Sequence, residues 1–213
     1  MLKVLALIKR LPTLDRKAFR DHYENTHVGV AKPLLRHLVR YARHHIEEEL
    51  HGEVDFDVIT SFGYADKPAL DAMFAVLASD AAGPILEDEK RFMDKEANRF
   101  FEVSERAWKE GEEEDRSIFV FVARPPDMSR TECSRCLVRD HWPALLEGAS
   151  DLRFAIVRDA FPMAGRPLTF DGGMQLSLDS GVDVRGFAAA LSKKDFRVVA
   201  VQTRRFVTPV PQG

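Results

Sequence analysis

Four residues in the first 45 positions combine the side chains needed for proton transfer with those needed for anion stabilisation. His27 is a histidine, whose imidazole can move a proton to or from a carbon or oxygen acid near pH 7. Tyr41 could donate a hydrogen bond to a developing enolate or phenolate, and Arg40 or Arg43 could stabilise the negative charge. This combination predicts acid/base catalysis on a small molecule that carries a carbonyl group.

A structural role explains His27 equally well. The helix expected before Pro33 has an apolar stripe that includes Phe19 and Tyr23, and His27 lies next to this stripe. The ring is therefore expected in the seam between this helix and a sheet. A histidine also occurs 114 positions later, at His141, so a shared structural hydrogen bond and catalysis both remain open.

The segment 37–48 is expected to be a strand and holds the richest polar patch of the chain. Because side chains alternate along a strand, they form two faces, Tyr41, Arg43 and His45 on one and Arg40, Ala42 and His44 on the other. If one face lines a cavity, the site belongs to the first half of the chain only, since the later counterpart segment is mostly apolar. The alternative is an exposed strand edge that carries charges against aggregation.

Other residues that could do chemistry have simpler interpretations. His22 lies five residues before His27, roughly 140° away around an α-helix, so we expect a rim position and no shared metal. Cys133 and Cys136 lack the further cysteines that a structural zinc site requires, and packing explains Cys133.

Asp57 and Asp171 each follow a phenylalanine before an expected strand. A turn or cap role is the simpler account, and orientation of a nearby histidine is the alternative. The sequence contains no phosphate-binding loop, dinucleotide-binding glycine motif, zinc-protease motif or serine-hydrolase elbow. These absences argue against the common nucleotide-dependent and hydrolytic enzymes.

Composition limits the possible partners and location. The chain has 213 residues, a formal net charge of −3 and two cysteines. Nucleic-acid binders usually carry a surplus of positive charge, and a bilayer span needs about 20 apolar residues in a row. We therefore expect a cytoplasmic protein with a small apolar organic substrate and neither a nucleic-acid nor a membrane partner.

An internal repeat predicts the domain organisation. The same spacing of 114 positions separates Pro12 from Pro126 and His27 from His141, and the pair Phe56-Asp57 recurs as Phe170-Asp171 at that spacing. A charged run without apolar residues lies between the copies. The prediction is a first unit over 1–108, a linker over 109–116 and a second, diverged unit over 117–213.

Each unit is expected to follow the order β-α-β-β-α-β of a ferredoxin-like fold. Two helices cover only one face of such a four-stranded sheet, so the second unit can cover the other face. The predicted fold is therefore α+β, with two ferredoxin-like units in one chain that form a pseudo-dimeric α/β barrel. The chain could close its own barrel as a monomer, or form a homodimer.

The first unit resembles the EthD family of the dimeric α/β-barrel superfamily. The resemblance rests on the basic strand end Lys9-Arg10, the aromatic residues and histidine of 19–27, and the second strand 40–45. It covers about residues 1–108 and is weaker in the second unit, which lacks the basic strand end. The superfamily includes lactone isomerases, polyketide cyclases, cofactor-free monooxygenases and haem-dependent peroxidases, so the resemblance implies the fold more firmly than the chemistry.

Three functions follow as expectations. The first is a small enzyme of catabolism or secondary metabolism that acts by proton transfer on a lactone, quinone or polyketide-like molecule without a cofactor, through His27, Tyr41, Arg40 and Arg43. The second is an oxidoreductase of the same fold, either cofactor-free or with a haem held by His27 or His141. The third is a non-enzymatic ligand-binding protein of an oxidative degradation pathway.

Overall fold

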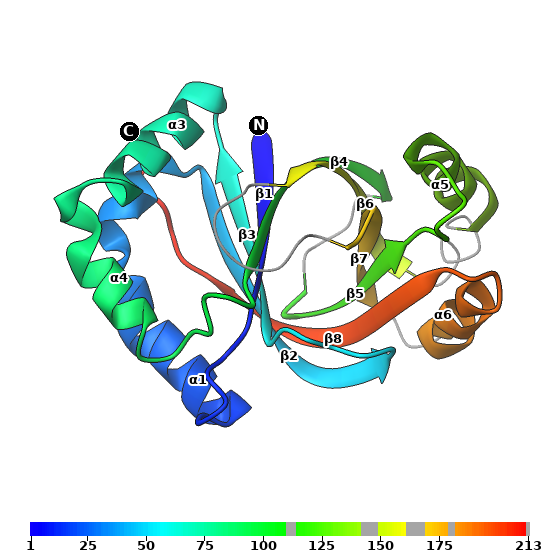
Figure 1. Ribbon diagram of the computed structural model, residues 1–213, viewed down its shortest axis with the longest axis horizontal. Coiled ribbons are helices and arrows are strands. Elements are labelled where there is room, and N and C mark those ends of the chain that lie inside the picture. Colours follow the sequence, from blue (N-terminus) through cyan, green and yellow to red (C-terminus); the bar gives the residue numbers. More distant parts are fainter. Residues whose placement is uncertain (110–113, 142–148, 161–168, 179–181, 212–213) are drawn as a thin grey trace.

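The computed structural model describes residues 1–109, 114–141, 149–160, 169–178 and 182–211. Its eight strands close into one antiparallel barrel, and the helices lie outside this barrel (Figure 1). The predicted α+β class and the predicted barrel are therefore confirmed.

The first half supplies four strands and the helical segments between them. In chain order these are β1 (Leu2–Ile8), α1 (Arg16–His22), a π-helical turn (Tyr23–His27), α2 (Val28–Val30), a 3-10 helix (Lys32–His37), β2 (Arg40–His51), β3 (Val58–Tyr64), α3 (Lys67–Leu77), a short 3-10 helix (Asp80–Ala82), α4 (Gly83–Glu89) and β4 (Arg99–Lys109). Pro84 occupies the first turn of α4, where its missing N–H leaves no helical bond unmade.

The second half follows the same order with shorter helices. Its elements are β5 (Arg116–Ala123), α5 (Arg130–Cys136), a second π-helical turn (Leu137–His141), β6 (Ala149–Ala160), β7 (Gly172–Leu178), α6 (Val184–Ser192) and β8 (Arg197–Val207). Residues 110–113 of the expected linker lie outside the described residues, and Lys109 and Arg116 belong to β4 and β5. Descent of the two halves from one duplicated unit stays a prediction.

The strand order around the barrel is β1-β3-β2-β8-β5-β7-β6-β4. The first half thus contributes the order β4-β1-β3-β2, and the second half contributes the matching order β8-β5-β7-β6. Two antiparallel ladders join the halves, one between β2 and β8 and one between β4 and β6. The barrel is therefore closed by strands of a single chain.

Apolar side chains of both halves fill the barrel interior. Phe119 and Phe121 of β5 stack at 6.1 Å between ring centroids, and Phe56 meets Phe121 edge to face at 5.7 Å. His44 of β2 also lies in this interior, with its ring centroid 4.8 Å from that of Phe119. The interior buries one face of every strand, so the helices can cover only the outer faces.

The helices cover the barrel on two sides. In Figure 1, α1, α3 and α4 lie outside the first-half strands, and α5 and α6 lie outside those of the second half. Cys133 of α5 is fully buried in the apolar core between these helices and the barrel. Its predicted packing role is confirmed, and both cysteines are free thiols.

Asp57 and Asp171 secure equivalent turns after the first strand of each half. Asp57 accepts a hydrogen bond from the backbone N–H of Arg10 at 3.1 Å, and Asp171 accepts one from that of Arg124 at 3.0 Å. Each carboxylate also pairs with the side chain of the same arginine. The predicted turn role of both residues is confirmed.

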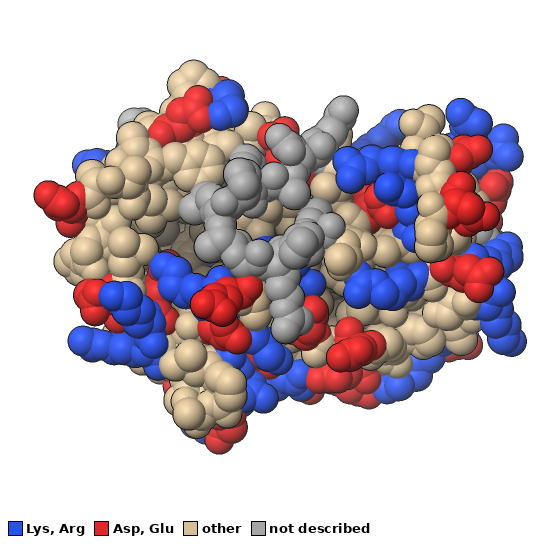
Figure 2. All heavy atoms as spheres, in the orientation of Figure 1, with Lys and Arg blue, Asp and Glu red and all other residues tan. Residues whose placement is uncertain are grey.

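The surface carries charges of both signs. Figure 2 shows Lys and Arg beside Asp and Glu over the visible face, so their long-range fields partly cancel. Within the described part of the chain, no single helix is long and apolar enough to cross a membrane. The segments Lys67–Leu77 and Asp80–Glu89 meet the length and composition requirements together, as a pair bent by 78°.

Candidate functional site

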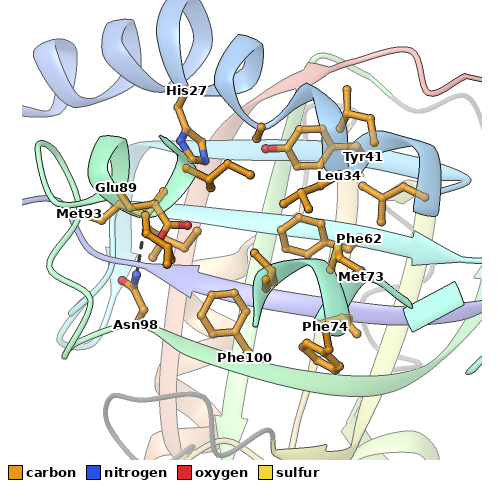
Figure 3. Close-up of a pocket in the computed structure, with 18 of the residues that line it drawn as sticks. His27, Leu34, Tyr41, Phe62, Met73, Phe74, Glu89, Met93, Asn98 and Phe100 are labelled. Carbon is orange, nitrogen blue, oxygen red and sulfur yellow. Dashed lines mark hydrogen bonds between the residues drawn. The ribbon is translucent and has the colours of Figure 1, made fainter. Parts of the chain in front are cut away.

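A cavity of about 370 Å³ lies between the outer face of the first-half sheet and the helices that cover it (Figure 3). Its volume is typical of a site for a small organic molecule. The apolar lining comprises Val4, Ile8, Ala31, Leu34, Leu35, Leu38, Phe62, Leu70, Met73, Phe74, Leu77, Ile85, Leu86, Met93 and Phe100, and the polar lining comprises Tyr23, His27, Tyr41, Tyr64, Glu89, Lys95 and Asn98.

His27 ends the π-helical turn, and its ring points into this cavity (Figure 3). The side chain is only 6% exposed, and Nδ1 lies 2.9 Å from Oδ2 of Asp88. Because a carboxylate accepts the Nδ1–H, Nε2 is left with the lone pair. Burial lowers the pKa of His27, while the carboxylates of Asp88 and Glu89 oppose this effect. The imidazole is therefore neutral at pH 7 and can act as a base.

Sequence reasoning missed Asp88, because it lies in a run of charged residues that resembles a solvated helix face. Its side chain is only 5% exposed. Ile85, Asp88 and Phe92 are all buried and are spaced by three and four residues. A carboxylate at a helical spacing from apolar neighbours was the signal that could have identified it.

His22 binds the second oxygen of the same carboxylate. Its Nε2 lies 2.9 Å from Oδ1 of Asp88, and its side chain is 27% exposed, which agrees with a rim position. The expectation that His22 and His27 diverge around the helix is wrong. Residues 23–27 form a π-helical turn, in which residues five apart are hydrogen-bonded neighbours on one face.

Tyr41 also lines the cavity, and Figure 3 shows its hydroxyl directed toward the side on which His27 lies. Tyr41 also interacts electrostatically with Tyr23, whose hydroxyl lies 3.1 Å from Oγ1 of Thr60. The Tyr41 ring stacks on Phe62 at 5.4 Å. Burial raises the pKa of Tyr41 well above its ordinary value, so the phenol stays protonated and can donate a hydrogen bond.

Arg43 lies on the same face of β2 as Tyr41 but is not a lining residue of the cavity. Its guanidinium makes two hydrogen bonds to Glu24, at 2.6 and 3.1 Å, and one to Thr208 at 2.8 Å. Nε2 of His45 donates to the same Glu24 carboxylate at 2.7 Å. The face that carries Tyr41, Arg43 and His45 therefore packs against the first helical segment.

Arg43 still influences the site through Tyr41, because its guanidinium carbon lies 4.5 Å from the centre of the Tyr41 ring. Arg40 lies on the other face of β2, with Ala42 and His44, and does not line the cavity. The structure therefore brings His27 and Tyr41 to one cavity and brings neither arginine to it.

The remaining polar lining lies at one side of the cavity. Lys95 and Glu89 form an ion pair at 2.5 Å, and the Lys95 side chain is 40% exposed. Asn98 accepts a hydrogen bond from the backbone N–H of Lys9 at 2.9 Å. Lys95 and Glu89 mark the edge at which the apolar cavity meets the surface, whereas Asn98 is buried.

The described lining does not fit a haem. His27 with its Asp88 partner has the form of an axial ligand, but two propionates would also need cationic partners. Lys95 is the cation among the described lining residues, and Glu89 already pairs with it. The side chain of His141 lies outside the described residues. In the described ranges, no group of three His, Cys, Asp or Glu side chains could hold a metal ion.

Comparison with known proteins identifies the first half of the chain. Residues 11–96 match the family model of the EthD domain. This segment is an EthD domain. The EthD domain contains the π-helical turn, β2 and α4, and hence His27, Tyr41 and Asp88. No curated protein matches the chain.

Solved structures with the same fold extend over almost the whole chain. An anthrone oxidase-like protein aligns with a TM-score of 0.56 at 12% identity, over 97% of this chain and 92% of that one. A candidate chlorite dismutase aligns with a TM-score of 0.51 at 7% identity, over 97% and 95% of the two chains. At such low identity, the likeness shows that the chain shares the fold of these proteins, and nothing about chemistry.

Proposed function

We propose that this chain is a small enzyme that transfers a proton on an apolar, carbonyl-bearing molecule, such as a lactone, a quinone or a polyketide-like aromatic. One observation carries the proposal. His27 lies in an apolar cavity with Nδ1 held by Asp88, so Nε2 is the nitrogen left for a ligand. A phenolic donor, Tyr41, lines the same cavity.

The mechanism follows from the state of each group. His27 is neutral and accepts a proton from the carbon next to the carbonyl onto Nε2. Asp88 stabilises the imidazolium that forms, as a carboxylate does beside any catalytic imidazole. Tyr41 donates a hydrogen bond to the carbonyl oxygen, where negative charge develops. The proton returns from Nε2 to another atom of the substrate in an isomerisation or cyclisation.

The apolar lining supports this chemistry in two ways. It favours binding of a neutral aromatic or aliphatic ring through burial of apolar surface. It also excludes water, which strengthens the hydrogen bond to the developing oxyanion. A strongly charged substrate would find few partners there, since Lys95 already pairs with Glu89.

A second candidate is cofactor-free oxidation, and the likeness to an anthrone oxidase-like protein favours it. Its first step would be the same, because an activated carbon acid must lose a proton to His27 before its carbanion can react with dioxygen. The two candidates differ in whether dioxygen is consumed.

Anthrone is a suitable probe, because it is an apolar aromatic ketone with an acidic methylene group. We expect the wild-type protein to catalyse exchange of the methylene protons for deuterium in D₂O without dioxygen. His27→Gln should slow this exchange by about 10²- to 10⁴-fold, and His37→Gln, outside the cavity, should not. Proton exchange that is equal in the wild type and His27→Gln would contradict the proposal.

Two further measurements separate the alternatives. Consumption of one dioxygen per anthrone, with anthraquinone and water as products, would favour the oxidase. Binding of anthrone without exchange or oxidation would favour a ligand-binding protein. Ala31→Leu adds bulk to the cavity wall and should weaken anthrone binding whichever alternative holds.

A further inference from the structure

Two histidines share one buried carboxylate at the edge of the cavity. We propose that Asp88 and His22 are positioning residues for His27. Asp88 fixes the tautomer and the ring orientation of His27, and His22 holds the second oxygen of Asp88 and couples His27 to the charge at the surface. The catalytic meaning of this unit rests on the proposed function, whereas its geometry and titration do not.

The carboxylate of Asp88 is held from both sides. Oδ2 lies 2.9 Å from Nδ1 of His27, and Oδ1 lies 2.9 Å from Nε2 of His22. With each oxygen bonded to a different ring, rotation of the carboxylate would break both hydrogen bonds. Asp88 therefore presents a fixed acceptor to His27, and a fixed acceptor selects the Nδ1–H tautomer.

Packing holds the two rings in place. Phe92 contacts both, with ring centroids 4.6 Å from His22 and 5.0 Å from His27. The edge of Tyr23 meets His27 on another side at 5.1 Å. The rings are thus oriented by aromatic contacts as well as by hydrogen bonds, as an acid/base group requires.

The arrangement joins the cavity to the surface. The exposed fraction of the side chain is 6% for His27, 5% for Asp88 and 27% for His22. His22 is thus the only member of the three with substantial contact with water. A change of charge on His22 is therefore transmitted to His27 through the carboxylate that they share.

The charged groups that face His27 are few and define the sign of the coupling. Asp88 and Glu89 of α4 favour a proton on His27, and a charged His22 opposes it. Lys95 pairs with Glu89 and partly offsets its effect. Loss of the Asp88 charge should lower the pKa of His27, and loss of the His22 charge should raise it.

The second half of the chain lacks one part of this arrangement. Cys136 ends α5, directly before the second π-helical turn, as His22 ends α1 directly before the first. A cysteine cannot supply a positive charge. His141 is the one histidine in the sequence 117–213, so that half has no second histidine to couple to it.

The test is nuclear magnetic resonance of protein labelled with ¹⁵N in histidine, which reports the tautomer and the pKa of each ring without a substrate. In the wild type, we expect His27 to carry its proton on Nδ1. Asp88→Asn should lower the pKa of His27 by about one unit. His22→Gln should raise it by about half a unit, as expected for loss of a nearby positive charge.

Two matched variants serve as controls. Glu87→Gln removes a charge from the residue next to Asp88, on a side chain that is 65% exposed and pairs with Lys90. His37→Gln removes a histidine that is bonded to Arg36 instead. Neither control should change the tautomer of His27 or shift its pKa.

Two results would overturn the proposal: a His27 tautomer on Nε2 in the wild type, or a pKa of His27 in His22→Gln equal to that in the wild type. If the Asp88→Asn variant does not fold, the pKa of His27 in the His22→Gln variant still tests the proposal. Because these readouts need no turnover, they are distinct from a failure of proton exchange on anthrone, which would reject the proposed function and leave the coupled unit intact.

Discussion

The ring of Tyr41, on β2, stacks on that of Phe62, on β3, with the ring centroids 5.4 Å apart. The guanidinium carbon of Arg43 lies 4.5 Å from the centre of the Tyr41 ring. The Tyr41 ring is therefore held in place before any ligand binds. A donor that is already oriented does not have to reorganise when charge develops on a substrate oxygen.

Tyr41→Phe should remove this donor while it retains the ring and its stacking on Phe62. We expect turnover of the anthrone probe to fall by about 10²-fold, the effect typical of loss of one donor to a developing oxyanion. The dissociation constant of anthrone from the Tyr41→Phe variant should differ little from that of the wild type. Stopped-flow measurement of proton exchange and equilibrium binding will separate the two quantities.

Tyr64→Phe is the matched control, because Tyr64 also lines the cavity and its hydroxyl donates to the sulfur of Met73 at 3.3 Å. Turnover of anthrone by the Tyr64→Phe variant should match that of the wild type. Equal losses in the two variants would show that any change of the cavity lining lowers turnover, and would remove the specific role of Tyr41.

Glu24 joins the first helical segment to β2 through Arg43 and His45. The Arg43 side chain is 2% exposed and that of Glu24 is 13% exposed. Glu24→Gln leaves the buried guanidinium without its counter-ion, so we expect the free energy of unfolding to fall by about 3 to 5 kcal/mol. Urea unfolding followed by circular dichroism measures this change.

An exposed ion pair serves as the control for the loss of unfolding free energy expected in Glu24→Gln. Lys67 and Asp71 form such a pair on α3, with side chains 60% and 57% exposed. Asp71→Asn should lower the free energy of unfolding by less than about 1 kcal/mol. A similar small effect of Glu24→Gln would mean that water reaches Arg43 and that the pair does not fix β2 to the helix.

The sequence allowed the fold and the half that contains the site to be predicted, because both depend on regular patterns. The strand expected over 37–48 is observed as β2 (Arg40–His51), and helical spacing placed His27 beside a sheet. The alternation of side chains along β2 predicted correctly that Tyr41 and Arg43 share a face. It could not tell which face lies against the helices, since both faces carry polar residues.

The parts that could not be predicted depend on irregular geometry and on long-range contacts. The relation between His22 and His27 was missed because a π-helical turn replaces the regular 3.6-residue period. Asp88 was missed because its partners lie 61 and 66 residues earlier in the chain. The predicted role of Arg43 at the cavity did not anticipate Glu24, which takes up its guanidinium.

His44 should make the fold sensitive to mild acid. It is buried in the barrel interior, and burial, with Lys3, Arg205 and Arg40 as further causes, holds its pKa well below the ordinary value of about 6.5. The unfolded chain therefore binds a proton first as the pH falls. The free energy of unfolding is fully retained above about pH 6.5 and falls by up to about 1.4 kcal/mol per pH unit below it.

His44→Gln should reduce this dependence between pH 6.5 and pH 5, a range above the titration of most carboxylates. The lowered pKa values of His27 and His45 act in the same direction, so part of the slope will remain. Urea unfolding at several pH values measures the slope, with His37→Gln as the control. An unchanged slope in His44→Gln would show that His44 does not contribute to the acid sensitivity.

Cys133 should be unreactive in the folded protein, although the sequence places it three residues from a second cysteine. Its side chain is fully buried, and burial raises the pKa of the thiol to about 11. A thiol reagent attacks the thiolate, which is scarce at pH 8 for such a group. The Cys136→Ser variant should therefore show no reaction with a chromogenic disulfide until it is unfolded, whereas Cys133→Ser should react in the native state through the partly exposed Cys136. Rapid labelling of native Cys136→Ser would contradict this prediction and show that the core around α5 opens readily.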